Sequence, residues 1–537
     1  MFFKKLHFRQ LKTRPIFRLF FPHKIPESHF SIIKSFIFVK DKILNMLRKL
    51  RISFAVVVFA LITFLFLDFT GTIHAYFGWL AKIQLLPAIL ALNFGVVTGL
   101  IVLTLVFGRL YCSVICPLGI MQDVFGRLGR IGKKNKYKYS FSKNHTILRV
   151  VVLVLFIIFL LVPGIGAVAH LIAPYSAYGR IAANLLAPVY ALCNNGLAYI
   201  AERMDSYAFY SVDVWIKSIS SLVIATITLV VLAVLAWRNG RTWCNNICPV
   251  GTVLGYIAKF SIFKPIIDTE KCNGCGLCAR TCKAACINTE AHEIDYSRCV
   301  TCFNCVETCN RDAMHYTRRK KTETESAPQD DSRRKFLSVA ALLTAGTMVK
   351  AQTKKVDGGL AVIQDKKIPT RTTPPKPAGS QSLRHFTKNC TACQLCISVC
   401  PNHVLRPSNN LETLMQPEMQ FEDGFCRPEC VRCSEVCPTG AIQKITPAEK
   451  SAIQIGHAVW IKENCIVETD GEKCGSCASH CPVGAILMVV KDEFNPVLKI
   501  PVVNTERCIG CGQCEYYCPA RPLSAIYVEG NEVQREI

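Results

Sequence analysis

The sequence lacks the motifs by which most redox enzymes hold a nucleotide or a covalent haem. No G-x-G-x-x-G stands between a strand and a helix, and no G-x-x-x-x-G-K-[ST] occurs, so no nucleotide site is predicted. No C-x-x-C-H occurs, which excludes covalent c-type haem. With these cofactors excluded, the 30 cysteines become the main guide to function.

Acidic residues are also scarce: 38 Asp and Glu stand against 63 Lys and Arg, a formal charge of +25. Thirteen Lys and Arg lie in residues 1–51 and eight lie between Arg127 and Arg149, in both places beside apolar runs. This distribution is typical of a membrane protein with its basic loops in the cytoplasm. The sequence therefore predicts a lipid bilayer as partner and no nucleic acid.

Four apolar runs, residues 52–67, 85–107, 147–172 and 214–237, predict an α-helical membrane domain of four spans over 52–263. Residues 1–51 are predicted to be a basic cytoplasmic segment. The stretches 68–84 and 173–213 carry one and two Lys or Arg, so both are predicted to lie outside. The predicted location is the bacterial inner (cytoplasmic) membrane, with several passes.

Two of the predicted spans lead into the same pattern, G-R-x-aromatic-C-x-x-x-C-P-x-G, at an offset of 132 residues. Two-fold packing of this repeat would bring Cys112, Cys116, Cys244 and Cys248 together. Three alternatives stay open for them: a further metal or Fe–S centre, a redox disulfide, or four structural thiols. A reducing cytoplasm disfavours a standing disulfide, and convergent thiolates without a cation would repel one another. We therefore favour the metal or Fe–S centre.

Residues 264–316 contain two C-x-x-C-x-x-C-x-x-x-C motifs. Three cysteines at this spacing hold one corner of a cubane while the fourth reaches the neighbouring cluster. A tetrahedral zinc site needs only two C-x-x-C pairs, so the third cysteine disfavours zinc. The sequence predicts a cytoplasmic α+β ferredoxin-like domain with two [4Fe–4S] clusters, held by Cys272, Cys275, Cys278, Cys282, Cys299, Cys302, Cys305 and Cys309.

A linker, residues 317–381, contains S-R-R-K-F-L followed by a short apolar run, together residues 332–351. The segment resembles a twin-arginine export signal placed inside the chain. From Phe336 the run has 14 residues, roughly 21 Å as a helix, which is short for a span of roughly 30 Å. The sequence therefore predicts that the C-terminal domain is exported to the periplasm, whether or not the segment is cleaved. Residues 352–381 read as a flexible tether.

Residues 382–537 contain four further groups of four cysteines, each ending in Cys-Pro, and predict an α+β polyferredoxin domain. Two irregular groups lie between two regular ones, which suggests nested pairing: first with fourth, second with third. The total is six [4Fe–4S] clusters, with Cys193 and Cys286 left as ordinary packed thiols. The predicted ligands are Cys390, Cys393, Cys396, Cys400, Cys426, Cys430, Cys433, Cys437, Cys465, Cys474, Cys477, Cys481, Cys508, Cys511, Cys514 and Cys518.

On these motifs the chain resembles two families joined end to end. Residues of roughly 52–316 resemble NapH-type membrane ferredoxins, and residues 332–537 resemble NapG-type polyferredoxins with their S-R-R-x-F-L signal. The resemblance implies a quinol dehydrogenase that takes electrons from membrane quinol and passes them to a periplasmic reductase or cytochrome. In those families the two parts are separate subunits, whereas here they are one chain.

Quinol oxidation releases two protons, so a proton acceptor is needed near the membrane interface. Asp68, His74 and His170 lie at the outer ends of predicted spans and are the candidates. Interfacial polar residues without a special role are the alternative for each. Two other functions stay open for the whole chain, metal-centre assembly and redox regulation, although no separate sensory or flavin-binding domain is apparent.

Overall fold

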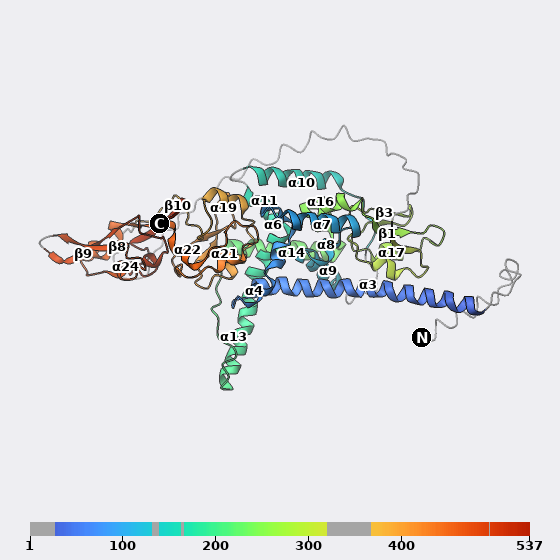
Figure 1. The fold of residues 1–537 in the computed structure, drawn as a ribbon, viewed down its shortest axis with the longest axis horizontal. Coiled ribbons are helices and arrows are strands. Elements are labelled where there is room, and N and C mark those ends of the chain that lie inside the picture. Colours follow the sequence, from blue (N-terminus) through green and yellow to red (C-terminus); the bar gives the residue numbers. More distant parts are fainter. Residues whose placement is uncertain (1–26, 131–138, 163–165, 319–366, 493–494) are drawn as a thin grey trace.

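A computed structural model of the chain describes residues 27–130, 139–162, 166–318, 367–492 and 495–537. A layer of helices occupies the middle of the elongated molecule (Figure 1). The first ferredoxin domain lies at one end of this layer, with α17, and the C-terminal domain lies at the other, with α19 and α21. The predicted export signal, residues 332–351, lies outside the described residues.

Four helices run between the two ends of the layer: α3 (Glu27–Leu67), α7 (Phe94–Phe107), α10 (Thr146–Leu161) and α14 (Ile219–Asn239). Their outward side chains are apolar and exposed, as at Val56, Ile147 and Ile227. Helices that are apolar on every side are built for a lipid environment. In the part of the chain that the structure describes, three helices are long and apolar enough to cross a membrane: Met46–Leu67, Pro174–Arg203 and Ile219–Asn239.

The predicted second and third spans are interrupted in the structure. The second divides into α6 (Leu85–Leu90) and α7, and the third into α10 and α11 (Gly166–Ile172). Asn93 starts α7 by accepting a hydrogen bond from the Val96 N–H through its side chain, which explains the break between α6 and α7. The first predicted span, residues 52–67, ends where α3 ends, at Leu67. Helix α3 begins at Glu27, however, 25 residues before the predicted start of the span.

The segment predicted to be an outside loop, residues 173–213, is mostly helical. It forms α12 (Pro174–Ile181), one π-helical stretch (Ala182–Leu186) and α13 (Ala187–Arg203). Figure 1 shows α13 projecting from the C-terminal end of the layer, across the direction of α3. Short helices α4 (Thr72–Phe77) and α5 (Trp79–Lys82) follow α3 in the other predicted outside segment.

The sequence repeat is a structural repeat with the same offset. The short helix α8 (Leu110–Val114) and α9 (Pro117–Leu128) correspond to α15 (Thr242–Asn246) and α16 (Pro249–Ala258). In each copy a glycine with positive φ, Gly108 or Gly240, ends the preceding long helix. Proline then stands at the first position of the following helix, where its missing N–H costs no hydrogen bond.

The first ferredoxin domain is closed by an antiparallel strand pair that joins its two ends. Strand β1 (Phe263–Ile267) pairs with β4 (Met314–Arg318). Between them lie α17 (Leu277–Thr281), α18 (Asn304–Thr308) and the short pair β2 (Ile287–Asn288) and β3 (Glu293–Ile294).

The C-terminal domain contains two ferredoxin-like halves. The first holds α19 (Leu383–Asn389), α20 (Leu395–Ser398), β5 (Leu405–Pro407), a 3-10 turn (Leu411–Thr413), β6 (Pro417–Met419) and α21 (Arg432–Val436). After α22 (Pro447–Ala452), the second half holds the antiparallel pairs β7 (Ile453–Trp460) with β10 (Ile526–Glu536) and β8 (Ile486–Asp492) with β9 (Asn495–Val503). Its short helices are α23 (Ile466–Thr469), α24 (Ser476–Ser479) and α25 (Gln513–Tyr516), with a 3-10 turn at Lys462–Asn464.

The predicted tether is shorter than the sequence suggested, because its last part belongs to the C-terminal domain. Residues 367–381 pack on that domain, where Lys376 and Ala378 are buried. The Thr373 N–H donates to Glu529 Oε1 at 2.7 Å, and the Gln443 N–H donates to the Gly379 carbonyl at 2.9 Å. Residues 367–381 therefore belong to the C-terminal domain, although the sequence had placed them in the linker.

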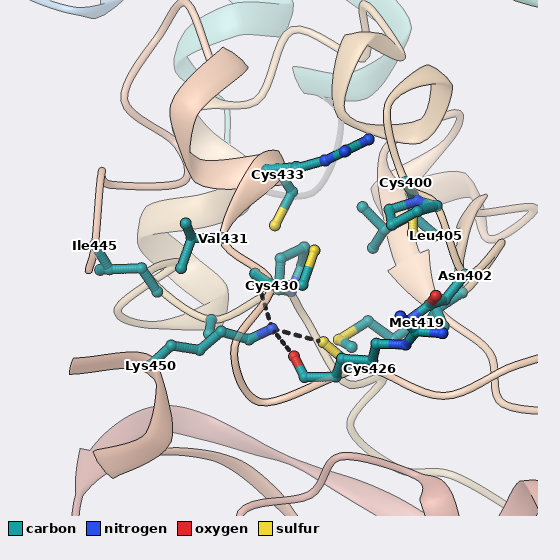
Figure 2. A pocket seen from close by; sticks show the side chains of 16 residues that line it. Cys400, Asn402, Leu405, Met419, Cys426, Cys430, Val431, Cys433, Ile445 and Lys450 are labelled. Carbon is teal, nitrogen blue, oxygen red and sulfur yellow. Dashed lines mark hydrogen bonds between the residues drawn. The ribbon is translucent and has the colours of Figure 1, made fainter. Parts of the chain in front are cut away.

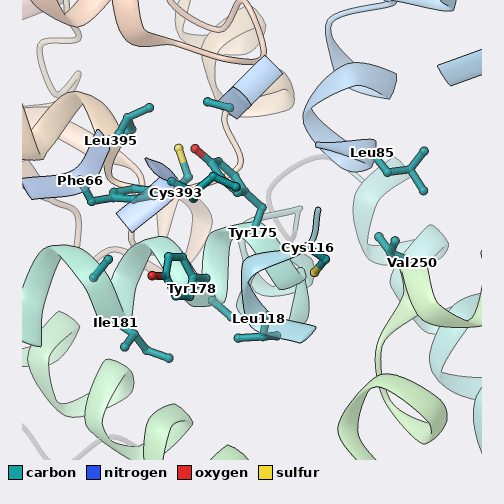
Figure 3. Close-up of a cluster of buried hydrophobic side chains, with 14 of the residues drawn as sticks. Phe66, Leu85, Cys116, Leu118, Tyr175, Tyr178, Ile181, Val250, Cys393 and Leu395 are labelled. Carbon is teal, nitrogen blue, oxygen red and sulfur yellow. The ribbon is translucent and has the colours of Figure 1, made fainter. Parts of the chain in front are cut away.

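One apolar core joins the helical layer to the C-terminal domain. Figure 3 shows Phe66, Tyr175 and Tyr178 packed together, with Cys393 and Leu395 of the C-terminal domain beside them. The rings of Phe66 and Tyr175 lie 5.8 Å apart. At Gly179 an added Cβ would lie 2.3 Å from the Cys393 carbonyl, so the glycine permits this close approach. The two parts are thus docked, not merely tethered.

Candidate iron–sulfur centres

In the first ferredoxin domain the two cysteine motifs exchange their fourth members, as the sequence predicts. Cys282, the last cysteine of the first motif, lines one cavity with the first three of the second motif, Cys299, Cys302 and Cys305. Burial raises the pKa of Cys278 to about 11, and the neighbouring sulfurs of Cys272, Cys309 and Cys275 add to this effect. The cysteines that lie together as candidate ligands are therefore Cys282, Cys299, Cys302 and Cys305 in one group, and Cys272, Cys275, Cys278 and Cys309 in the other.

Cys286 is not an ordinary packed thiol. It lies in the same cavity as the second group, and its sulfur is 3.5 Å from that of Cys282. The regular spacing of the motif gives no signal for a fifth sulfur there, because Cys286 falls after the fourth cysteine. Cys193, by contrast, is exposed on α13.

The C-terminal domain follows the same exchange between neighbouring motifs. Figure 2 shows Cys400, from the first motif, facing the cavity that Cys426, Cys430 and Cys433 of the second also line. Correspondingly, the pKa of Cys396 is raised by burial and then by Cys390, Cys393 and Cys437.

The third and fourth motifs are paired in the same way. Cys465, Cys474 and Cys477 share a cavity with Cys518, the last cysteine of the fourth motif. Beside Cys508 and Cys511 lies Cys481, which adds to the raised pKa of both. The nested pairing predicted from the spacing is therefore wrong: motifs adjacent in sequence share their clusters. The wider first gap, between Cys465 and Cys474, contains the short helix α23.

The cysteine groups fit [4Fe–4S] clusters. Cavities are lined by four or more sulfurs drawn from two neighbouring motifs. Backbone N–H groups donate to several sulfurs, as from Ala313 to Cys309 Sγ at 3.3 Å and from Ala485 to Cys481 Sγ at 3.2 Å. Such donors stabilise the negative charge of ligating thiolates. When bound, each cluster accepts and returns one electron.

The repeated CxxxCP motifs are locked together by two arginines that cross between them. Arg109 of the first copy donates through Nη2 to the carbonyl of Cys244, at 3.2 Å. Arg241 of the second copy donates through Nη1 to the carbonyl of Cys112, at 2.6 Å. The arginine in the shared pattern is thus explained: each one holds the other copy in place.

The glycine that ends the pattern is explained by close packing within each copy. A Cβ at Gly119 would lie 2.3 Å from the Cys112 carbonyl, and one at Gly251 would lie 2.2 Å from the Cys244 carbonyl. No L side chain fits at these distances. The absence of Cβ lets α9 and α16 approach the short helices that carry the first cysteines.

All four CxxxCP cysteines are buried, with 3–4% of their surface exposed. Burial raises the pKa of Cys244 to about 11 and raises those of Cys116 and Cys248 as well. The charge of Cys244 adds to the raised pKa of Cys116, and that of Cys116 adds to the raised pKa of Cys248, so the sulfurs of each motif act on a cysteine of the other. Without a cation these thiols stay protonated, whereas a bound metal centre would hold them as thiolates.

Polar donors point at the sulfurs of this quartet, as they do in the ferredoxin motifs. Gln122 donates through Nε2 to Cys244 Sγ at 3.0 Å, and the Gly251 N–H donates to Cys248 Sγ at 3.3 Å. The structure thus places the four predicted residues together and adds Gln122, which the sequence pattern does not single out.

Comparison with known proteins agrees with this geometry. A family model described as a 4Fe-4S binding domain matches residues 89–136 and 220–267, which contain the two CxxxCP motifs. A model described as a 4Fe-4S dicluster domain matches residues 379–467 and 471–521.

Among curated proteins, the ferredoxin-type protein MauM of Methylorubrum extorquens is 30% identical over 148 residues, 27% of this chain and 67% of MauM. The chain belongs to the ferredoxin-type iron–sulfur electron-transfer proteins. Ferredoxin-type protein NapG of Haemophilus influenzae is 25% identical, covering 37% of this chain and 72% of NapG. The putative electron transport protein YccM of Escherichia coli is 26% identical, covering 42% of this chain and 55% of YccM. No solved structure matches the chain.

In this ferredoxin-type chain the predicted proton acceptors Asp68 and His74 form a pair. Asp68 Oδ2 lies 3.4 Å from His74 Nδ1, and the carboxylate also accepts the N–H groups of Thr70, Gly71 and Ile73. Although burial acts to raise it, these hydrogen bonds hold the pKa of Asp68 below its ordinary value. Most of the carboxylate is therefore engaged in starting α4. The buried Nε2 of His74 has no hydrogen-bond partner among the described residues.

His170 lies apart in the hydrogen-bond network. Its ring is buried in α11, and Arg180 donates to its backbone carbonyl at 3.2 Å. Within the described part of the chain, no hydrogen bond joins His170 to Asp68 or His74. The structure thus brings two of the three candidates together and leaves the third separate.

One cluster ligand of the ferredoxin-type chain has a buried cation beside it. Lys450 Nζ donates to Cys426 Sγ at 3.2 Å and to the carbonyls of Arg427 and Cys430, as the dashed lines in Figure 2 show. A positive charge here favours the reduced, more negative state of the cluster. Nothing in the cysteine spacing signals this lysine, which comes from α22.

We expect Lys450→Met to lower the reduction potential of the cluster held by Cys400, Cys426, Cys430 and Cys433. The loss of a charged hydrogen bond corresponds to a shift on the order of 60 mV or more. Redox titration followed by electron paramagnetic resonance measures it, with Lys444→Met, an exposed lysine nearby, as control. Unchanged potentials with full cluster content would contradict this role.

Proposed function

We propose that this chain is a quinol dehydrogenase of the bacterial cytoplasmic membrane. It joins a NapH-type membrane part to a NapG-type polyferredoxin and passes electrons from membrane quinol to a periplasmic reductase or cytochrome. Six [4Fe–4S] clusters and a further Fe–S centre in the CxxxCP quartet carry the electrons. The shared family descriptions and the seven groups of four cysteines support this assignment.

The observation that carries the proposal is that iron–sulfur domains are attached at both ends of one apolar helix. At one end of the span, Arg48 forms an ion pair with Glu307 of the first ferredoxin domain. Just beyond the other end, Arg432 of the C-terminal domain donates to the Phe69 carbonyl at 3.1 Å. From Arg48 to Leu67 the helix rises roughly 29 Å, close to the roughly 30 Å of a hydrocarbon core.

Three other helices run between the same two ends (Figure 1), and each contacts one of the two iron–sulfur domains, which supports four crossings. The Phe107 carbonyl, at the end of α7, accepts from Thr301 of the ferredoxin domain at 3.0 Å. At the start of α10, Arg149 donates to Ser297 Oγ of that domain at 2.9 Å. At the start of α14, Ser221 accepts from Gln394 of the C-terminal domain at 2.8 Å.

The basic residues assign the sides of the membrane in this proposal. Among the described residues, the Arg48 end carries the basic side chains Arg48, Lys49, Arg51, Arg127 and Arg130, and so faces the cytoplasm by the positive-inside rule. The C-terminal domain is then periplasmic. The chain must cross between residues 318 and 367, the connection that contains the export-signal-like segment.

A quinol site is proposed at the periplasmic end, in a cavity of about 430 Å³ between the helical layer and the first C-terminal motif. Phe69 and Trp215 supply aromatic surface, and Cys400, a cluster ligand, forms part of the opposite wall. The Trp215 and His403 rings lie 4.7 Å apart. Aromatic walls with a few polar groups suit a quinol ring, and a cluster ligand in the wall suits electron removal.

Oxidation of a quinol to a quinone releases two electrons and two protons. Clusters of the C-terminal domain would take the electrons one at a time. Asp213 and His403 in the cavity wall, and the Asp68–His74 pair near the end of α3, are the proton acceptors that this site offers.

The deciding experiment is reduction of the clusters by a quinol in liposomes under anaerobic conditions. We expect Trp215→Ala to raise the quinol concentration needed for half-maximal rate about tenfold, because ring packing is lost. Reduction by dithionite should be unchanged, since it bypasses the cavity. Trp79→Ala, an exposed tryptophan in α5, is the matched control.

If quinol does not reduce the unmodified protein while dithionite does, the quinol dehydrogenase proposal fails. That result would favour metal-centre assembly or redox regulation instead. If Trp215→Ala and Trp79→Ala had equal effects, quinol oxidation would still be supported, but the cavity would not be its site.

A further inference from the structure

A basic pocket lies at the opposite end of the helical layer from the proposed quinol cavity. It has a volume of about 180 Å³ and is formed by α3, α9 and Lys283 of the first ferredoxin domain. Five cationic side chains line it, with a single carboxylate, Asp123, among them: Arg48, Arg51, Arg127, Arg130 and Lys283.

The carboxylates near this pocket are already engaged. Arg241 donates to both oxygens of Asp123, at 2.7 Å each, and Lys283 also bonds to Asp123. Arg51 reaches Asp123 only at 3.8 Å, and Arg48 is paired with Glu307. Among the described residues, no ion pair joins Arg127 or Arg130 to a carboxylate. Positive charge therefore exceeds negative charge inside the pocket.

The pocket contains buried donors without an acceptor. Nε of Arg48, Arg51 and Arg130 is buried and has no hydrogen-bond partner in the described part of the chain. Arg51 is 91% buried, since only 9% of its surface is exposed. Arg51 also donates through Nη1 to the Ser113 carbonyl at 3.4 Å, and Arg130 lies over the Tyr139 ring, but neither contact supplies a negative charge. Buried cationic donors are costly unless an anion satisfies them, so the arrangement favours an anionic ligand with several acceptor oxygens.

The other walls of the pocket are apolar and continue into the membrane span. Ile52, Ala55 and Val56 line it, and all three belong to the span Met46–Leu67. At the same end, the ring of Trp237 packs within about 3 Å of where a Cβ of Gly129 would lie. Tryptophan at the end of a span is typical of the membrane–water interface. A polar end and an apolar wall at this depth match a phospholipid, not a free anion.

We propose that this pocket binds the phosphodiester headgroup of an anionic phospholipid such as phosphatidylglycerol. The phosphate oxygens accept from the arginines, and the acyl chains lie along Ile52, Ala55 and Val56. Because α3, α9 and the ferredoxin residue Lys283 meet here, the lipid fastens the ferredoxin domain to the helical layer. This proposal does not depend on whether the protein oxidises quinol.

Native mass spectrometry of the full chain, released from nanodiscs of equal phosphatidylglycerol and phosphatidylcholine, tests the proposal. We expect retained phosphatidylglycerol on the unmodified protein. Arg127→Gln combined with Arg130→Gln should weaken its binding roughly 25-fold, about fivefold for each charge removed. Arg127 is exposed and Arg130 half-buried, so the fold should survive, which full iron content would verify.

Arg238→Gln is the matched control. This exposed arginine lies at the C-terminal end of α14, the end nearest the pocket, but it does not line the pocket. An equal loss in that variant would show a general surface attraction and overturn the site. Equal retention of the two lipids would overturn it as well. If inorganic phosphate displaces the lipid at equal concentration, the pocket is a free-anion site and the lipid assignment is wrong.

Discussion

Replacing Cys112 and Cys244 together by serine should remove about four irons from each chain. Six ferredoxin clusters and one centre in the CxxxCP quartet give about 28 irons, and the double variant should retain about 24. The reason is geometric: the variant takes one sulfur from each half of a buried site whose four thiols already influence one another. Iron analysis and electron paramagnetic resonance of anaerobic preparations measure the loss.

Cys193→Ser is the control for this count, because its thiol is exposed and belongs to no group of four. Its iron content should equal that of the unmodified chain. About 24 irons in both the unmodified protein and the double variant, with identical spectra, would show that the quartet consists of structural thiols. Zinc in place of iron would contradict the cluster assignment altogether.

Replacing Arg333 and Arg334 by lysine should keep the C-terminal domain in the cytoplasm. The twin arginines are the part of such a signal that its receptor reads, so nearly all export should be lost. In spheroplasts of the unmodified strain, added protease should digest residues beyond 367, and in the variant these residues should be protected.

The matched control is Arg318→Lys together with Lys320→Arg, which conserves charge just before the signal. It should leave the protease pattern unchanged. If the C-terminal domain is protected in the unmodified strain as well, it lies in the cytoplasm, and the two iron–sulfur parts share one side of the membrane.

The cysteine groups could be predicted from sequence because the ligand rule is local. Three cysteines within seven residues can surround a cluster whatever the rest of the chain does. The fourth ligand is a tertiary contact, so spacing alone did not reveal that Cys400 joins Cys426 rather than a distant motif. The spacing suggested that the first motif pairs with the fourth and the second with the third, whereas in the structure the first pairs with the second and the third with the fourth.

The apolar helices were predictable where hydrophobicity is continuous, as in α14, and less so where it is interrupted. The side chain of Asn93 starts a new helix inside one apolar run, and α13 mixes apolar and polar residues in a segment with few charges. The roles of Lys450 and Gln122 could not be predicted from sequence. Each donates a hydrogen bond to a cysteine sulfur that is distant in sequence and that only the fold brings near.

The crossing of Arg109 and Arg241 has a consequence for biosynthesis. Cys112 and Cys116 leave the ribosome 132 residues before their counterparts. Until then the carbonyl of Cys112 has no Arg241 to accept from, and Arg109 has no Cys244 carbonyl to donate to. Until Arg241, Cys244 and Cys248 are made, the first half of the proposed centre is therefore two separate thiols. A centre in the quartet can be completed only after translation has passed Gly251.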